Sequence, residues 1–94
     1  MIKRGTAVVW HRPPFESLTA RKYRSGVVMR SDSGKALMTR THHEAEDYWG
    51  KCLSIVQEEY QTSDGFLMRG QAFFLEEGRS TAIRVPLDEL EERQ

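Results

Sequence analysis

The sequence lacks several features that would assign it to a class of protein. It contains one cysteine, Cys52, so a disulfide within the chain is excluded. No apolar run approaches the roughly 18 residues that span a membrane, and the apolar stretch after the basic start is shorter than the roughly 7–15 residues of a secretory signal. We therefore expect a cytoplasmic protein with a reduced thiol and no membrane contact.

Motifs for catalysis and cofactor binding are also missing. The 94 residues contain no phosphate-binding loop, no GxGxxG fingerprint, no CxxC pair, no GxSxG elbow and no HExxH pair. His42 and His43 precede Glu46 and Asp47 by four residues, a spacing that can share a metal on a helix, but no second set of ligands accompanies them. The sequence therefore predicts no enzymatic activity, no catalytic residue, no cofactor and no metal site.

Charge is present in both signs but is divided unevenly along the chain. Residues 1–40 contain nine basic and two acidic residues, whereas residues 41–94 contain five basic and twelve acidic residues. The two halves carry +7 and −7, which gives the net charge of zero. Such a division predicts a basic binding face, an acidic binding face, or two faces that attract each other within the fold.

The hydropathy pattern predicts a single domain of class α+β over residues 1–94. The segment Thr41–Tyr60 has apolar residues at helical spacing and begins with a capping box, while Gly50 lies opposite its apolar stripe without a packing role. Runs rich in β-branched and aromatic residues predict strands at 5–11, 22–30, 35–40, 66–76 and 80–85. Residues 15–21 are expected to be a loop, and residues 87–94 a mobile acidic tail. The expected fold is a five-stranded antiparallel sheet with one long helix packed on one face, in the order β-β-β-α-β-β.

The predicted N-terminal hairpin suggests a function in nucleic-acid binding. Basic side chains at this density neutralise phosphates, and a tyrosine among them can stack on a base. Over residues 22–50, the predicted sheet and the following helix, which opens T-x-x-E-A, are also similar to the arm-type DNA-binding domains of phage integrases. The resemblance is carried by a hairpin turn and a capping box, which are generic features. The simpler alternative is that these charges form the solvated rim of a small sheet. We expect a small regulatory module that contacts DNA or RNA, or a nucleic-acid-bound complex, through Lys22, Tyr23, Arg24, Arg30, Lys35 and Arg40.

An alternative function is that of a protein-binding inhibitor or adaptor of the compact type found on phages and mobile elements, including anti-CRISPR-like proteins. Strand 66–76 is apolar on both faces, and a single helix covers only one of them. We expect a homodimer or a heteromeric contact on the other face, because large exposed apolar patches are rare on monomers. A curled, barrel-like sheet is the arrangement that needs no partner. The residues expected at this protein interface are Leu67, Phe73, Leu75, Glu76 and Glu77.

Overall fold

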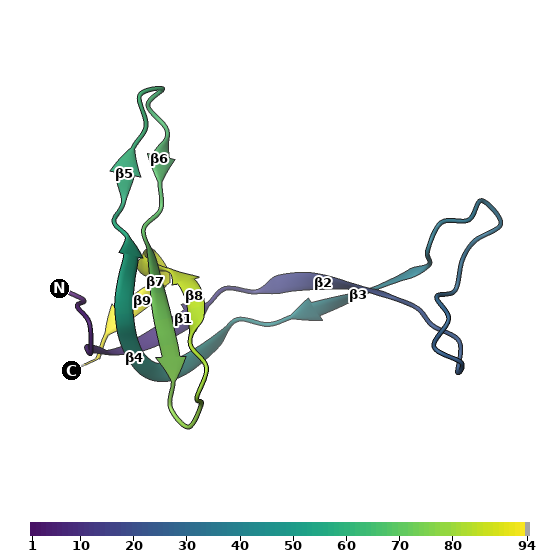
Figure 1. Cartoon of the computed structure of the whole chain (residues 1–94), viewed down its shortest axis with the longest axis horizontal. Coiled ribbons are helices and arrows are strands. Elements are labelled where there is room, and N and C mark those ends of the chain that lie inside the picture. The colour runs from purple at the N-terminus through teal and green to yellow at the C-terminus, as the bar shows by residue number, and fades with distance from the viewer. Residues whose placement is uncertain (94) are drawn as a thin grey trace. The chain divides into compact units, whose positions relative to one another are not determined.

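The computed structural model describes residues 1–93, which form antiparallel sheets (Figure 1). No α-helix occurs among these residues, and the one helical element is a 3-10 turn of three residues, η1 (Leu87–Glu89). The predicted α+β class and its order β-β-β-α-β-β are therefore wrong. The likeness to integrase arm-type domains also fails, because it required a helix after residue 40. Within the described range, no helix is long and apolar enough to cross a membrane.

The chain divides into two compact units, one made of residues 1–12 and 46–94 and the other of residues 13–45. The first unit contains a five-stranded antiparallel sheet in the order β8-β7-β4-β1-β9. In this order the last strand follows the 3-10 turn η1 and returns to pair with the first strand of the chain. The strands are β1 (Ala7–Arg12), β4 (Glu46–Gln57), β7 (Gln71–Glu76), β8 (Ile83–Pro86) and β9 (Leu90–Glu92).

The predicted helix Thr41–Tyr60 corresponds mainly to β4, a strand of 12 residues that curves strongly through the sheet in Figure 1. The register of β4 against β7 shifts between Cys52 and Ser54 and again between Ile55 and Gln57. Gly50, which has no side chain, takes the inward position between Tyr48 and Cys52, and the first register shift places the next inward side chain, Ile55, three residues after Cys52. The inward side chains are therefore spaced by four and three. That spacing also occurs on one face of a helix, which explains the wrong prediction.

The core of the first unit lies on the inner face of this curved sheet. Burial of a Val or Phe side chain contributes about 1.5–3 kcal/mol, so a few fully buried groups hold the unit together. Leu90 takes part in this core, and β9 pairs with β1, so the segment expected to be an acidic tail is part of the sheet. The buried cluster consists of Val8, Cys52, Ala72, Phe74, Val85 and Leu90.

A second hairpin extends the β4–β7 pair beyond the sheet. Its strands are β5 (Tyr60–Gln61) and β6 (Leu67–Met68), joined by a turn at residues 62–65. Buried Gly70 separates β6 from β7, so the strand expected over residues 66–76 is divided into two. We call residues 58–68 the apolar hairpin.

The unit of residues 13–45 is a β-ribbon without a second layer. β2 (Phe15–Ala20) pairs antiparallel with β3 (Met38–His43), so residues 15–21, expected to be a loop, are mostly a strand. None of the residues in this unit is fully buried. Its stability therefore rests on backbone pairing and cross-strand side-chain contacts more than on a core.

The ribbon divides beyond Ala20 into two short hairpins, which we call lobe A (residues 21–29) and lobe B (residues 30–36). Three backbone hydrogen bonds join the branches: Arg21 N donates to Leu37 O (2.8 Å), Leu37 N to Met29 O (2.9 Å) and Met29 N to Arg21 O (2.7 Å). These bonds form a closed cycle that involves no side chain. The predicted pairing of strands 22–30 and 35–40 is thus replaced by two separate hairpins, each with a single bridge.

Candidate nucleic-acid interface

Lobe A presents a tight turn with basic and aromatic side chains. Lys22 pairs with Val28, and Tyr23 N donates to Val27 O at 2.9 Å, which closes the turn. Gly26 N donates to Tyr23 O at 2.9 Å, and Gly26 has a φ of 86°, a left-handed conformation that favours glycine. The tip is a regular hairpin turn that holds Arg24 in solvent.

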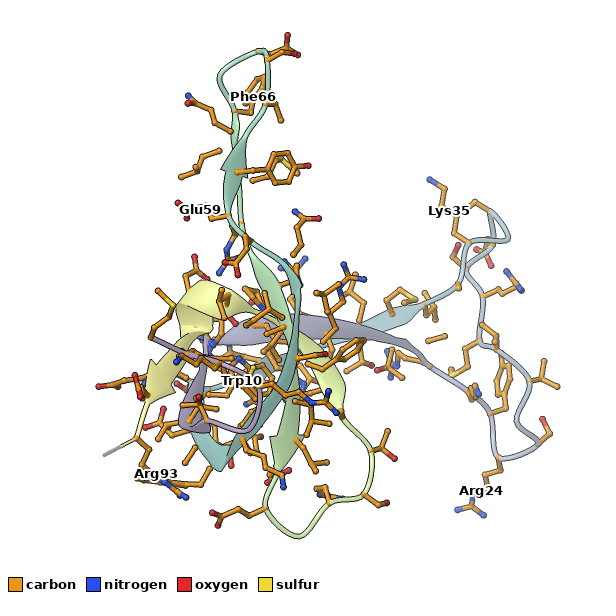
Figure 2. The ribbon with its side chains drawn as sticks, turned by 60° about the vertical axis from the view of Figure 1, so that its left-hand side comes forward. Trp10, Arg24, Lys35, Glu59, Phe66 and Arg93 are labelled. Atoms are coloured by element: carbon orange, nitrogen blue, oxygen red, sulfur yellow. The ribbon has the colours of Figure 1, made fainter. Side chains whose placement is uncertain are left out.

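Lobe B repeats the same turn and confirms the one predicted at residues 31–34. Gly34 N donates to Ser31 O at 2.8 Å, and Ser31 N donates to Lys35 O at 2.8 Å. The Arg30 guanidinium donates to Gly34 O at 3.0 Å, and the hydroxyls of Ser31 and Ser33 lie 2.9 Å apart. Figure 2 shows Arg24 and Lys35 on the separate turns of this unit.

The cations of the two lobes are exposed and almost free of intramolecular partners. Among residues 1–93, no ion pair or side-chain hydrogen bond involves Arg21, Lys22, Arg24 or Lys35, and Arg30 donates only to its own turn. Tyr23 is 56% exposed beside them. A free cation keeps its full Coulomb attraction for an incoming phosphate, because no ion pair has to be broken first.

The six residues predicted for nucleic-acid contact do not all lie together. Lys22, Tyr23, Arg24, Arg30 and Lys35 belong to the lobes, whereas Arg40 lies on β3. Arg40 Nε lies 3.4 Å from Glu16 Oε2 across the ribbon, so part of its charge is neutralised. Sequence reasoning missed Arg21, which stands at the base of lobe A. Its position next to Lys22 in the basic half of the chain was the available signal.

The histidines of this unit have ordinary structural contacts. The His43 ring stacks on Phe15 with ring centroids 4.5 Å apart, and its Nε2 lies 2.9 Å from Ser17 Oγ. His42 Nε2 lies 3.2 Å from Glu44 Oε1. Neighbouring strand residues point to opposite faces, so the two imidazoles do not converge. Over residues 1–93, no three His, Cys, Asp or Glu side chains are arranged to hold a metal ion.

The residues predicted for a protein interface lie on different parts of the first unit. Leu67 belongs to the apolar hairpin and is 64% exposed, whereas Phe73 and Leu75 share one face of β7. Glu76 points to the other face, and Glu77 lies at the following turn, where it accepts a hydrogen bond from Arg93 (3.1 Å). The structure therefore separates Leu67 and Glu76 from the Phe73–Leu75 face.

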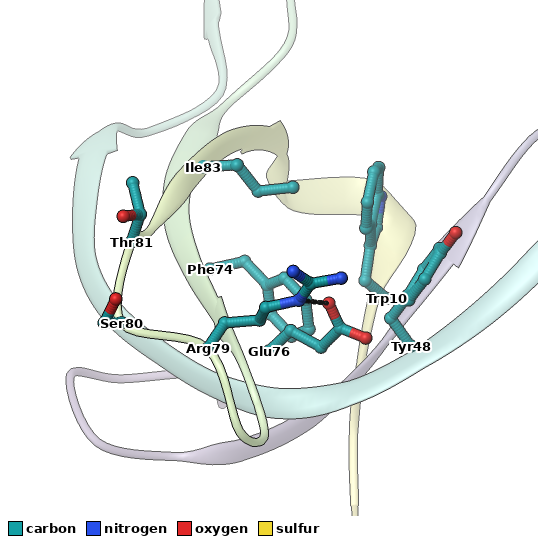
Figure 3. Close-up of a pocket in the computed structure, with 8 residues that line it drawn as sticks. All are labelled: Trp10, Tyr48, Phe74, Glu76, Arg79, Ser80, Thr81 and Ile83. Carbon is teal, nitrogen blue, oxygen red and sulfur yellow. Dashed lines mark ion pairs between the residues drawn. The ribbon is translucent and has the colours of Figure 1, made fainter.

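A pocket of about 440 Å³ opens on the inner face of the same sheet (Figure 3). Its walls include Trp10, which stacks on Tyr48 at 5.4 Å between ring centroids, and Phe74. The carboxylate of Glu76 lies in the pocket and forms an ion pair with Arg79 at 3.4 Å. The Trp10 indole N–H donates to Glu89, so its polar group is already bonded within the fold. Among the described residues, neither Ser80 nor Thr81, whose hydroxyls also line the pocket, is hydrogen-bonded to a base.

A histidine on the outer face of the sheet is held between two carboxylates. His11 Nδ1 lies 2.7 Å from Asp47 Oδ1, and His11 Nε2 lies 2.6 Å from Glu91 Oε2. The two hydrogen bonds to carboxylates raise the pKa of His11 above its usual 6.5, because they stabilise the imidazolium. This contact joins β1 to both neighbouring strands, so it stabilises the sheet.

Two further groups have structural explanations. Burial raises the pKa of the Cys52 thiol, which keeps it neutral and unreactive in the core. Arg69 donates hydrogen bonds to Asp88 and Glu89, which lowers the pKa of Asp88 and anchors the turn η1.

No family model, curated protein or solved structure matches the chain significantly.

Proposed function

We propose that this chain is a non-enzymatic binding module that contacts nucleic acid through lobes A and B. The observation that carries the proposal is the set of five exposed cations on the lobes, none of which forms an ion pair within the described chain. Cations of this kind contact phosphates, and such contacts position a protein on nucleic acid without reading its sequence. The set is Arg21, Lys22, Arg24, Arg30 and Lys35.

The shape of the lobes supports the same function. A two-stranded β-ribbon is narrow enough to enter the major groove of B-DNA, which is roughly 12 Å wide. The two turns are fixed by glycines and backbone hydrogen bonds, so little conformational entropy is lost when they contact a ligand. Tyr23 would stack on an unpaired base, a contact that contributes roughly 1–3 kcal/mol. The module would act in the cytoplasm, where Cys52 stays reduced.

A salt titration tests the proposal. A fluorescently labelled DNA duplex, an RNA duplex and a single strand are each titrated with the protein, and binding is followed by anisotropy between 50 and 200 mM salt. Five phosphate contacts predict a slope of about −4.5 for log K against log salt on B-DNA, which corresponds to a loss of roughly 500-fold in affinity. Absence of binding to all three probes at 50 mM salt would refute the function.

Matched variants locate the interface. Lys22→Gln with Arg24→Gln removes two lobe cations and should reduce the salt slope by about 2. Lys51→Gln with Arg84→Gln removes the same charge from the other unit and should leave the slope unchanged. Equal effects of the two pairs would show that net charge alone drives binding, and the lobes would lose their assigned role. Tyr23→Ala should weaken single-strand binding more than duplex binding.

A second candidate function is protein binding, and the observation that favours it is the apolar hairpin. Phe66 and Leu67 are 69% and 64% exposed, which is unusual for side chains of this size. A protein that co-purifies with the unmodified chain should no longer co-purify when Phe66→Ser and Leu67→Ser are introduced together. The same pair of substitutions should leave nucleic-acid affinity intact.

A further inference from the structure

The apolar hairpin exposes large side chains on a segment too small to bury them. Phe66 is 69% exposed, Leu67 64%, Tyr60 46% and Met68 41%. β5 and β6 contain two residues each, and a two-stranded hairpin has no inner layer. In Figure 2, Phe66 lies near the end of this hairpin. Aromatic and long aliphatic side chains displayed in this way are typical of protein contact surfaces.

The turn of the hairpin is fixed before any partner binds. Phe66 N donates to Thr62 Oγ1 at 3.0 Å, and Gln61 Nε2 donates to Gly65 O at 3.2 Å. Gly65 N donates to Thr62 O at 3.0 Å, and the φ of Gly65 is 87°. Because side chains and backbone together hold the turn, docking of this hairpin loses little conformational entropy.

The charge of the hairpin limits the partners that can bind it. Glu58, Glu59 and Asp64 are exposed, and none of them has an ion pair within residues 1–93. The nearest cation in sequence, Arg69, is held by Asp88 and Glu89. The hairpin is therefore apolar and acidic, a combination that is repelled by nucleic acid and by anionic lipid and is attracted by an apolar surface with basic residues around it.

We propose that this partner surface is provided by the lobes of a second copy of the same chain. In lobe A, Tyr23 is 56% exposed and Val27 61% exposed, and both lie among the unpaired lobe cations. The lobes thus offer apolar side chains within a basic surface, which complements an acidic apolar hairpin. Contact between two different surfaces of identical chains is heterologous, so it builds a closed ring or an open chain of copies. The exception is a dimer in which each copy places its hairpin on the lobes of the other.

This assembly uses the same cations that the proposed function assigns to phosphates. Nucleic acid and a second copy would then compete for the lobes, and a duplex in excess should dissociate the assembly. The two proposals remain separable, because the apolar hairpin has no part in phosphate binding. Variants of the hairpin should abolish assembly while leaving duplex affinity equal to or above that of the unmodified chain.

Solution mass measured by analytical ultracentrifugation tests the assembly. At low salt, the mass should rise above the 10.9 kDa of one chain as concentration increases. Glu58→Lys, Glu59→Lys and Asp64→Lys in one chain make both surfaces basic, and this variant should stay monomeric. Lys22→Glu, Arg24→Glu and Lys35→Glu make both surfaces acidic, and this variant should also stay monomeric.

The decisive result is the mixture of the two triple variants. Mixing them restores opposite charges between hairpin and lobes, so complexes that contain both variants should form and should be dissociated by salt. Near-ultraviolet spectra of each variant must match the unmodified chain, which shows that the substitutions leave the fold intact. The proposal is overturned if the unmodified chain is monomeric at low salt, if either triple variant assembles like it, or if the mixture stays monomeric.

Discussion

Gly50 is the position where a single added methyl group should do most damage to the first unit. The carbonyl oxygen of Leu75 lies where the Cβ of an alanine would be, and two ring carbons of Phe74 lie 2.8 Å from that point. Phe74 is 1% exposed, so its ring cannot turn aside without opening the core. The Leu75 carbonyl belongs to a strand paired with β4, so it cannot shift alone. Gly50→Ala therefore forces β4 and β7 apart.

The expected cost of Gly50→Ala combines two effects. Overpacking of a core costs about 1–3 kcal/mol. Weakening a buried backbone hydrogen bond in the β4–β7 ladder adds about 1–3 kcal/mol. We therefore expect the free energy of unfolding to fall by about 2–6 kcal/mol, a large fraction of the roughly 5–15 kcal/mol that stabilises a typical domain.

Urea unfolding followed by tryptophan fluorescence measures this loss. Both tryptophans, Trp10 and Trp49, lie in the first unit, and Trp10 packs against Phe74. Gly70→Ala is the matched comparison, because its added Cβ would meet Gln57 O at 3.0 Å and Glu59 N at 3.1 Å, contacts that require shifts of only a few tenths of an ångström. We expect that variant to lose about 1–2 kcal/mol. If Gly50→Ala is no less stable than Gly70→Ala, the close packing described at Gly50 does not hold.

Three further predictions concern titratable groups of the first unit. The pKa of His11 is raised in the folded protein, so the contribution of His11 to stability is complete below about pH 6.5 and is lost as the pH rises through the folded-state pKa. NMR titration measures that pKa, and His11→Gln should abolish this part of the pH dependence of stability. The pKa of Asp88 is lowered by Arg69, so the contribution of Asp88 to stability is present above pH 3.8 and is lost as the pH falls through the folded-state pKa. When urea unfolding midpoints are measured against pH, Arg69→Gln should reduce their fall at acid pH. Cys52 is 0% exposed and its pKa is raised, so a thiol reagent should label the native protein no faster than the core opens. The same reagent should label the unfolded protein rapidly in urea, and fast labelling without urea would contradict the burial of Cys52.

Turn chemistry was the part of the fold that the sequence predicted well. The turn at residues 31–34 forms because Ser31 and Ser33 hydrogen-bond locally and Gly34 supplies a left-handed residue, a rule that needs no tertiary information. The same rule applies at residues 62–65 and at residues 23–26, where serine or aspartate again precedes glycine. The turn at residues 23–26 was nevertheless missed, because it fell inside the predicted strand 22–30. Local signals of this kind are visible in a sequence because their energies depend on neighbouring residues alone.

The long central strand was not predictable by period alone. Gly50 leaves a spacing of four between the inward side chains Tyr48 and Cys52, and a register shift leaves a spacing of three between Cys52 and Ile55. Thr41 with Glu44 gave a false capping signal. Gly50 was the residue that disagreed with the helix, since it had no role there and has an essential close approach in the sheet. Pairing between segments far apart in the chain decides this strand, and hydropathy does not contain that information.

The candidate interface was predicted in part. Charge counting directed attention to Lys22, Arg24 and Lys35, which the structure places on the lobes without ion pairs in the described chain. It also included Arg40, which pairs with Glu16 because β2 lies opposite β3. The apolar hairpin was not predicted as a separate element, because residues 66–76 read as one uninterrupted strand. Of its exposed side chains only Leu67 was predicted at an interface, as part of a sheet face that the helix leaves uncovered.

The closed cycle of backbone hydrogen bonds at the base of the lobes has a consequence for how this chain can change. The bonds between Arg21, Met29 and Leu37 involve only main-chain atoms, so most side chains at and beyond the junction are free to differ. Each lobe is a loop whose two ends are fixed at the same point, and longer or shorter tips would leave that point intact. Evolution or an engineer could therefore exchange one recognition tip while keeping the other, much as variable loops are exchanged on a constant framework.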